Sequence, residues 1–141
     1  MRKARVIIFD DDLFILDILE RNFLKRGYEV LTYNDPTTCP IYLDHNATCE
    51  NKYPCADILI TDYLMPRMNG VEFLKYQSQR GCKLDIKNKL IISGVILDEN
   101  VSEFKELGCH FVRKPFKFSE LTEWLAECEK QMDLSLPLSN I

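Results

Sequence analysis

Four apolar runs of the chain each end in side chains that can bind or transfer charge. These side chains are an aspartate cluster, Asp10, Asp11 and Asp12, followed along the chain by Asp62, Ser93 and Lys114. Each run has the composition of a buried strand in a parallel sheet. Because ligands of such sheets bind outside the carboxyl ends of the strands, we expect these polar side chains to converge at one edge.

The residue types in this set indicate phosphoryl transfer. Crowded carboxylates repel one another, and a divalent cation relieves that repulsion. Mg²⁺ is usually held by one or two carboxylates, a carbonyl oxygen, waters and a phosphoryl oxygen. The Ser93 hydroxyl and the Lys114 ammonium could hold further phosphoryl oxygens while one carboxylate attacks phosphorus. We therefore expect Mg²⁺, or Mn²⁺ in its place, as the cofactor.

The elements that must position these side chains alternate along the chain. Strands are predicted over residues 5–9, 28–33, 57–61, 90–92 and 110–113, and apolar residues at helical spacing lie within 13–24, 71–76, 101–107 and 121–128. A further short helix, from Cys39 or Pro40 to His45, is expected in a long, proline-interrupted segment before the third strand. This order predicts an α/β fold with a doubly wound, five-stranded parallel sheet in a single domain.

Three residues are placed to define helix ends. Asp12 and Ser119 precede apolar-periodic segments and are expected to cap helix N-termini, while Gly27 follows a segment of the same kind and suits the C′ position. Asp12 is therefore expected to serve the helix rather than the charged site.

Length and composition exclude several classes of function. The 141 residues, 46% of them apolar, are enough for the core of one domain. We therefore expect the chain to need no partner in order to fold. A net charge of −4 provides no footprint for nucleic acid. No run approaches the roughly 20 apolar residues of a membrane span, and residues 1–3 lead into the first strand rather than into a signal peptide. We expect a cytoplasmic protein with no direct nucleic-acid or membrane contact.

Half of the six cysteines lie between the second and third predicted strands. Cys39, Cys49 and Cys55 share this segment with His45. A zinc site is one interpretation, but the spacings lack the paired C-x-x-C or H-x-x-x-H arrangement of such sites. Ordinary reduced thiols are the interpretation that we favour.

Four motifs together resemble the receiver domain of two-component response regulators, in its stand-alone, CheY-like form. They are IIFDDD from residue 7, DYLMPRMNG from residue 62, ISG from residue 92 and KPF from residue 114. The resemblance covers nearly the whole chain and implies a flavodoxin-like (βα)5 fold. It places a receiver domain at residues 1–129 and leaves 130–141 as a C-terminal tail. Three interpretations of this tail stay open, a flexible frayed end, a docking segment or the stub of a linker, and we slightly favour the frayed end.

The resemblance implies a role for each residue of the site. Asp62 would be the phosphoacceptor, taking a phosphoryl group from a histidine kinase or a histidine phosphotransfer protein. Ser93 would donate its hydroxyl to the phosphoryl group, and Lys114 would pair with it. The metal ligands would be Asp10, Asp11, Asp62 and the backbone carbonyl of Leu64. The chain would be no enzyme beyond self-phosphorylation from a phosphodonor and slow autodephosphorylation.

Ser93 and Phe111 would form the switch of such a domain. Phosphorylation would pull Ser93 inward and let Phe111 fill the vacated space, although plain core packing explains Phe111 equally well. The face made by the fourth helix, fifth strand and fifth helix, over residues 95–107 and 117–128, would then repack. An unknown downstream protein or a homodimer would read that change. The bond before Pro115 is often a cis peptide in this family.

Two positions beside the site carry apolar residues, whereas rapid hydrolysis of an acyl phosphate would need polar side chains there. Leu64 and Val95 stand two residues beyond Asp62 and Ser93, where polar side chains could orient an attacking water. We therefore expect a slowly hydrolysing acyl phosphate, suited to sustained signalling.

Two other functions stay open on the sequence. The string FDDD from residue 9 also resembles the nucleophile loop of haloacid dehalogenase-type phosphatases, with Asp10 as nucleophile and Asp12 as acid/base. That family needs a further acidic loop after the lysine, and this interpretation leaves the Asp62 motif unexplained. The other function is a receiver-like binding module that never takes phosphate. Such modules usually lack one of the site residues, and none is missing here.

Overall fold

One parallel sheet organises the chain. In the computed structural model, which describes residues 1–40 and 48–141, the strands are β1 Arg5–Phe9, β2 Glu29–Tyr33, β3 Ile58–Asp62, β4 Lys89–Ser93 and β5 His110–Arg113. All neighbours pair in parallel, in the order β2-β1-β3-β4-β5. The predicted doubly wound α/β fold is confirmed, and each of the five expected strands forms within one residue of its predicted bounds.

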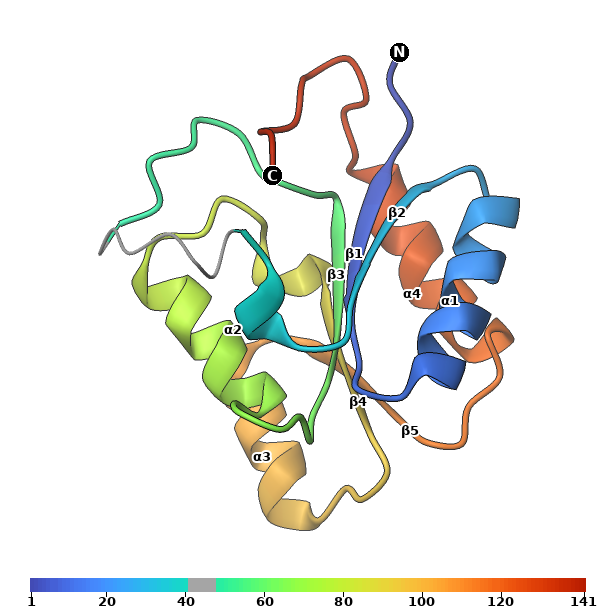
Figure 1. Cartoon of the computed structure of the whole chain (residues 1–141), viewed down its shortest axis with the longest axis vertical. Coiled ribbons are helices and arrows are strands. Elements are labelled where there is room, and N and C mark those ends of the chain that lie inside the picture. Colours follow the sequence, from blue (N-terminus) through green and yellow to red (C-terminus); the bar gives the residue numbers. More distant parts are fainter. Residues whose placement is uncertain (41–47) are drawn as a thin grey trace.

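Helices cover both faces of this sheet (Figure 1). They are α1 Leu13–Lys25, α2 Gly70–Gln79, α3 Asp98–Leu107 and α4 Ser119–Lys130. Alternate residues of β1 point to opposite faces: Val6 and Ile8 pack with α1 and α4, while Ile7 and Phe9 pack with α2 and α3. Because both faces are buried, the strands need apolar residues without alternation, as their sequences show.

The segment between β2 and β3 differs from the prediction where it is described. A 3-10 helix spans Pro36–Thr38, and Cys39 leaves it with an extended backbone. The expected helix therefore does not begin at Cys39, because Asp35 caps a turn that starts earlier, at Pro36. The rest of that predicted helix, up to His45, lies outside the described residues.

Two of the three predicted helix ends are confirmed. Asp12 accepts a hydrogen bond from the Phe14 N–H at 2.9 Å, and Gly27 follows α1 with φ of +92°. Ser119 is wrong as a cap, because it is the first helical residue and Phe118 precedes it. The Glu120 carboxylate reaches back instead and accepts a hydrogen bond from the Lys117 N–H at 2.7 Å.

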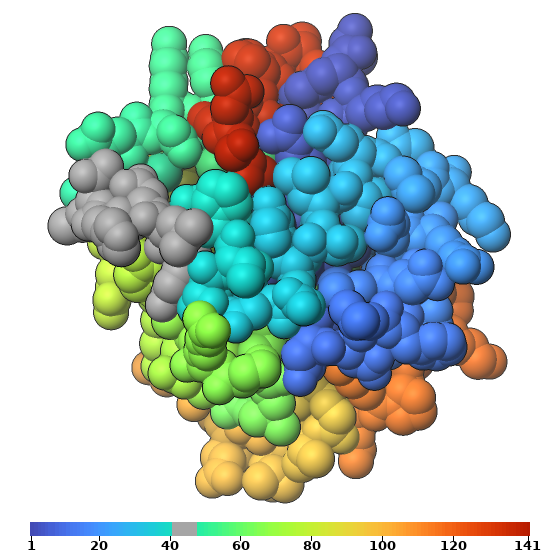
Figure 2. All heavy atoms as spheres, viewed as in Figure 1, coloured from blue at the N-terminus to red at the C-terminus, as the bar shows by residue number. Residues whose placement is uncertain are grey.

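The residues after α4 lie along the amino end of the sheet. The Arg2 N–H donates to the Leu134 carbonyl at 3.3 Å, and the Ser139 N–H donates to the Pro54 carbonyl at 2.8 Å. Figure 2 shows these last residues filling the space between the N-terminal residues and the segment before β3. No helix of the described residues is long and apolar enough to cross a membrane.

Candidate functional site

The candidate site lies at the carboxyl edge of the sheet, where β1 and β3 are neighbours and the strand order reverses (Figure 1). Side chains reach this edge from four strands: Asp10 and Asp11 after β1, Asp62 at the end of β3, Ser93 at the end of β4 and Lys114 after β5. The parallel topology therefore gathers at one edge residues that lie up to 104 positions apart in the sequence.

The Lys114 ammonium joins two of the carboxylates. Its Nζ lies 3.0 Å from Asp10 Oδ2 and 3.3 Å from Asp62 Oδ1. The Lys114 N–H donates to the Ser93 carbonyl at 2.7 Å, which ties the end of β5 to the end of β4. The bond from Lys114 to Pro115 is cis, as the resemblance predicted.

The three aspartates after β1 have different environments. Asp10 is fully buried, and its Oδ1 accepts a hydrogen bond from the Asp12 N–H at 2.9 Å. Asp11 is exposed at the mouth of the site, and Asp12 caps α1. Asp10 and Asp11 are therefore available to the site, whereas Asp12 serves the helix.

Burial and charge set the proton affinities of this cluster. Burial, together with the charge of Asp10, raises the pKa of Asp62 to about 7, although the Lys114 ammonium acts to lower it. Burial also raises the pKa of Asp10, although the hydrogen bond from the Asp12 backbone and the nearby Lys114 ammonium act to lower it. Burial lowers the pKa of Lys114, but its bonds and attraction to the two carboxylates outweigh that effect and raise it. The site holds more negative charge than one lysine neutralises.

The donor set fits a hard divalent cation. Carboxylate oxygens of Asp10, Asp11 and Asp62 lie within 4.8 Å of one another. Asp10 Oδ2 is buried, and within the described residues it accepts no well-oriented hydrogen bond and faces only the Lys114 ammonium. Oxygen ligands with one exposed member suit Mg²⁺, which keeps several waters. These residues fit Mg²⁺.

The cysteines do not form a second metal group within residues 1–40 and 48–141. The aspartate cluster is the group of potential ligands found there, and Cys39, Cys49 and Cys55 do not converge in the same way. His45, the remaining member of the suggested zinc site, lies outside the described residues.

The two predicted switch residues have different surroundings: Ser93 is hydrogen-bonded within its own loop, whereas Phe111 packs against an aromatic ring. Ser93 is buried, and its hydroxyl donates to the Val95 carbonyl at 2.6 Å, so it serves its own loop. Phe111 is half-buried with its ring centre 5.2 Å from that of Phe104, which lies 5.8 Å from the ring of Tyr63. Aromatic contacts therefore lead from the residue after Asp62 to Phe111. No sequence pattern predicts this path, since Tyr63 and Phe104 carry no signal beyond being aromatic.

The loop from β3 to α2 is held close to Asp62. The Gly70 N–H donates to the Tyr63 carbonyl at 2.8 Å, and a Cβ at Gly70 would lie only 2.6 Å from the Asp62 backbone oxygen. Asn69 and Glu72 form a reciprocal capping box at the start of α2. The close approach needs glycine at position 70 and fixes the backbone of Asp62.

The buried position of Asp10 bears on the phosphatase alternative. One oxygen of this carboxylate is held by a backbone N–H and the other faces an ammonium, and the residue has no exposed surface. A nucleophile must reach its substrate, and the proposed acid/base, Asp12, is engaged in capping α1. The geometry disfavours a reaction that uses Asp10 as nucleophile.

Comparison with known proteins identifies the same family that the sequence motifs resemble. The family model of the response regulator receiver domain matches residues 6–126. The two-component response regulator ORR26 of Oryza sativa subsp. japonica is 30% identical over 132 residues, covering 91% of this chain and 21% of that protein. The chain spans 18–21% of the length of its curated plant relatives and 53% of PhoP of Bacillus subtilis.

Solved structures agree with these relatives. The chemotaxis protein CheY4 of Vibrio cholerae has 26% identity and a TM-score of 0.68, covering 90% of this chain and 99% of its own. The receiver domain of the Francisella response regulator 1452 has 22% identity and a TM-score of 0.72, covering 92% of this chain and 100% of its own. The second likeness shows the fold alone.

Proposed function

The chain belongs to the response regulator receiver family, whose members are signalling modules and phosphoacceptors of two-component systems, and we propose that Asp62 is its phosphoacceptor. The observation that carries this assignment is the position of Asp62 at the strand-order switch point. There its carboxylate lies 3.3 Å from the Lys114 ammonium and within 4.8 Å of oxygens from Asp10 and Asp11.

The proposed reaction transfers a phosphoryl group from a phosphohistidine to Asp62. The Asp62 carboxylate attacks phosphorus, an O–P bond forms, and the P–N bond to the donor imidazole breaks. Asp10, Asp11, Asp62 and the Leu64 carbonyl would hold Mg²⁺, which when bound neutralises phosphoryl charge. With a pKa of about 7, Asp62 is a mixture of acid and carboxylate at neutral pH, and the attacking form needs positive charge beside it. Lys114 supplies part of that charge.

The partners follow from this chemistry. The phosphodonor would be a histidine kinase or a histidine phosphotransfer protein. After transfer, the Ser93 hydroxyl would leave the Val95 carbonyl for a phosphoryl oxygen, and Phe111 would turn into the vacated space. The face formed by α3, β5 and α4, which corresponds to the expected output face, would then favour a downstream protein or a second copy of the chain.

The covalent chemistry would be limited to self-phosphorylation and slow hydrolysis. The side chains of Leu64 and Val95 are 65% and 57% exposed beside the site, and neither can orient a water for attack on the acyl phosphate. We expect the phosphorylated form to last minutes or longer, and a half-life of seconds would contradict this.

The proposal includes a cytoplasmic location. In that compartment the six cysteines would be reduced thiols.

Intact mass after incubation with acetyl phosphate and Mg²⁺ tests the proposed function. We expect one phosphoryl group on the wild type, and none with EDTA or in Asp62→Asn. No addition despite Mg²⁺ binding would favour a phosphate-independent module. Catalytic release of phosphate that is lost in Asp10→Asn would favour the phosphatase instead.

A further inference from the structure

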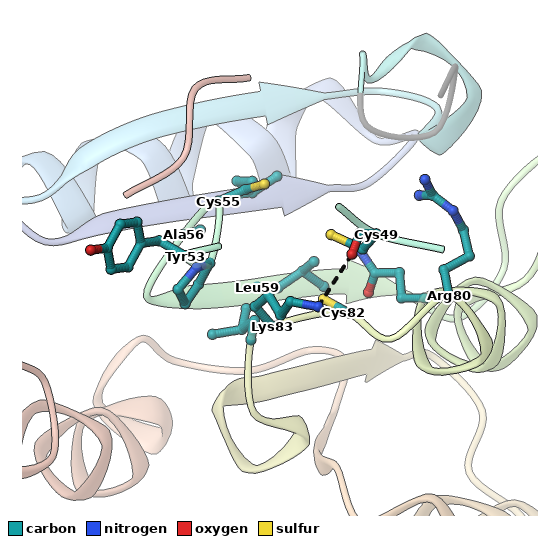
Figure 3. A pocket seen from close by; sticks show the side chains of 12 residues that line it. Cys49, Tyr53, Cys55, Ala56, Leu59, Arg80, Cys82 and Lys83 are labelled. Carbon is teal, nitrogen blue, oxygen red and sulfur yellow. Dashed lines mark hydrogen bonds between the residues drawn. The ribbon is translucent and has the colours of Figure 1, made fainter. Parts of the chain in front are cut away.

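A second cluster of reactive side chains lies away from the carboxyl edge of the sheet. Cys49, Cys55 and Cys82 line a half-open cavity of about 30 Å³ between the segment before β3 and the end of α2 (Figure 3). The cavity has room for about one or two small polar molecules. Its cysteines come from two separate parts of the chain, and no step of the proposed phosphoryl transfer uses them.

A buried cation lies beside one of these cysteines. Lys89 is only 2% exposed, and its Nζ lies 3.0 Å from Gln77 Oε1 and 3.4 Å from Cys82 Sγ. Within the described residues, no carboxylate pairs with this ammonium. A buried ammonium needs negative charge nearby, and an amide oxygen supplies only a dipole. The sulfur of Cys82 lies within hydrogen-bond distance of this ammonium, whose charge also acts on the buried Cys109 thiol.

Cys49 is held against the turn that carries Cys82. Its N–H donates to the Arg80 carbonyl at 2.5 Å, and its carbonyl accepts a hydrogen bond from Lys83 Nζ at 3.2 Å (Figure 3). Cys49 and Cys82 are both half-buried, so a small oxidant can reach them. Burial raises the pKa of Cys55 to about 11, with repulsion from Cys49 and Cys82 adding to it. Cys55 is therefore the poorer nucleophile of the pocket.

We propose that Cys82 and Cys49 form an oxidisable dithiol that reacts with hydrogen peroxide, with Lys89 stabilising the attacking sulfur. The Cys82 thiolate attacks the peroxide, an S–O bond forms, and the O–O bond breaks. Cys82 becomes a sulfenic acid, and the departing hydroxide takes a proton to become water. The Cys49 sulfur then attacks the Cys82 sulfur, which forms the disulfide and releases a second water. A cellular dithiol would restore both thiols.

The disulfide would join the segment before β3 to the end of α2. It would lie toward the amino end of β3, whereas Asp62 closes the carboxyl end of the same strand. The proposal does not depend on phosphorylation, and its test uses no phosphodonor.

The experiment exposes the folded protein to a small excess of hydrogen peroxide, blocks remaining thiols, and maps peptides without reduction. We expect a peptide pair linked through Cys49 and Cys82, and in Cys49→Ser a sulfenic acid at Cys82 that dimedone traps. Cys55→Ser should leave the link unchanged. A link through Cys55, links only between molecules, or trapping at another cysteine would overturn the proposal.

Alkylation rates test the part played by Lys89. We expect Lys89→Met to slow the reaction of Cys82 with iodoacetamide at pH 7 by about tenfold, because the cation beside the sulfur is lost. Gln77→Leu removes the other hydrogen-bond partner of Lys89 but keeps the ammonium beside the sulfur, so Cys82 should stay reactive. Buried Cys128 should remain unreactive in each folded variant. Equal rates in the wild type and Lys89→Met would refute the role of the cation.

Discussion

Replacing Asp62 with asparagine should stabilise the metal-free protein, and more strongly as the pH rises. Folding raises the pKa of Asp62 to about 7, from an unfolded value of about 3.9. Between these values the folded state binds more protons, so the free energy of unfolding falls as the pH rises through about 4 to 7. An asparagine at this position would carry no such penalty, because an amide does not ionise.

The size of the effect follows from the pKa difference. At about 1.36 kcal/mol for each pKa unit, the gap between Asp62→Asn and the wild type is about 1.5 kcal/mol at pH 5 and about 4 kcal/mol at pH 8. The difference between these two gaps, about 2.5 kcal/mol, contains no pH-independent cost of the substitution, because such a cost is the same at both pH values. The difference in melting temperature between Asp62→Asn and the wild type should therefore be larger at pH 8 than at pH 5 by roughly 10 °C for a chain of this length.

Urea unfolding of both proteins at pH 5 and pH 8, with EDTA present, measures this widening. A gap between Asp62→Asn and the wild type that is the same at both pH values would refute the argument, because Asp62 would then titrate alike in the folded and unfolded chains.

Three further predictions concern the same site. Mg²⁺ at about 100 times its dissociation constant should raise the free energy of unfolding by about 2.7 kcal/mol at pH 8, and calorimetric affinity should fall below pH 7 as protons compete for Asp62. Gly70→Ala should cost about 1–3 kcal/mol in urea unfolding and slow phosphorylation, because its Cβ would meet the Asp62 backbone, whereas Gly94→Ala points into open space and should be nearly neutral. Leu64→Asn should shorten the half-life of the acyl phosphate several-fold in a mass-spectrometric time course, and an unchanged half-life would contradict the role given to this position.

The strands were predictable because burial on both faces demands unbroken apolar runs. Each run was visible in the sequence, and the bounds differ by at most one residue. Lys89 is the exception: as a lysine it lies outside the fourth predicted strand, yet it begins β4 and is buried. Its partners, Gln77 and Cys82, come from α2 and the turn after it, and no local sequence pattern predicts these contacts.

The convergence of the site side chains was also predictable, since parallel strands bring their carboxyl ends to one edge of the sheet. The different environments of Asp10 and Asp11 were not, because burial depends on how the first loop turns over the sheet. The bond from Ser93 to the Val95 carbonyl is equally a product of loop geometry. Ser119 failed as a cap because the first turn begins before it: the Glu120 N–H donates to the Lys117 carbonyl, and the Glu120 carboxylate accepts from the Lys117 N–H.

The most direct test of the central claim is to locate the phosphoryl group. Protein phosphorylated with acetyl phosphate and Mg²⁺ is reduced with borohydride, which converts an aspartyl phosphate to homoserine, and is then mapped by peptide mass spectrometry. We predict homoserine at position 62 alone. Homoserine at Asp10 or Asp11, with Asp62 unchanged, would contradict the assignment of Asp62 as the phosphoacceptor.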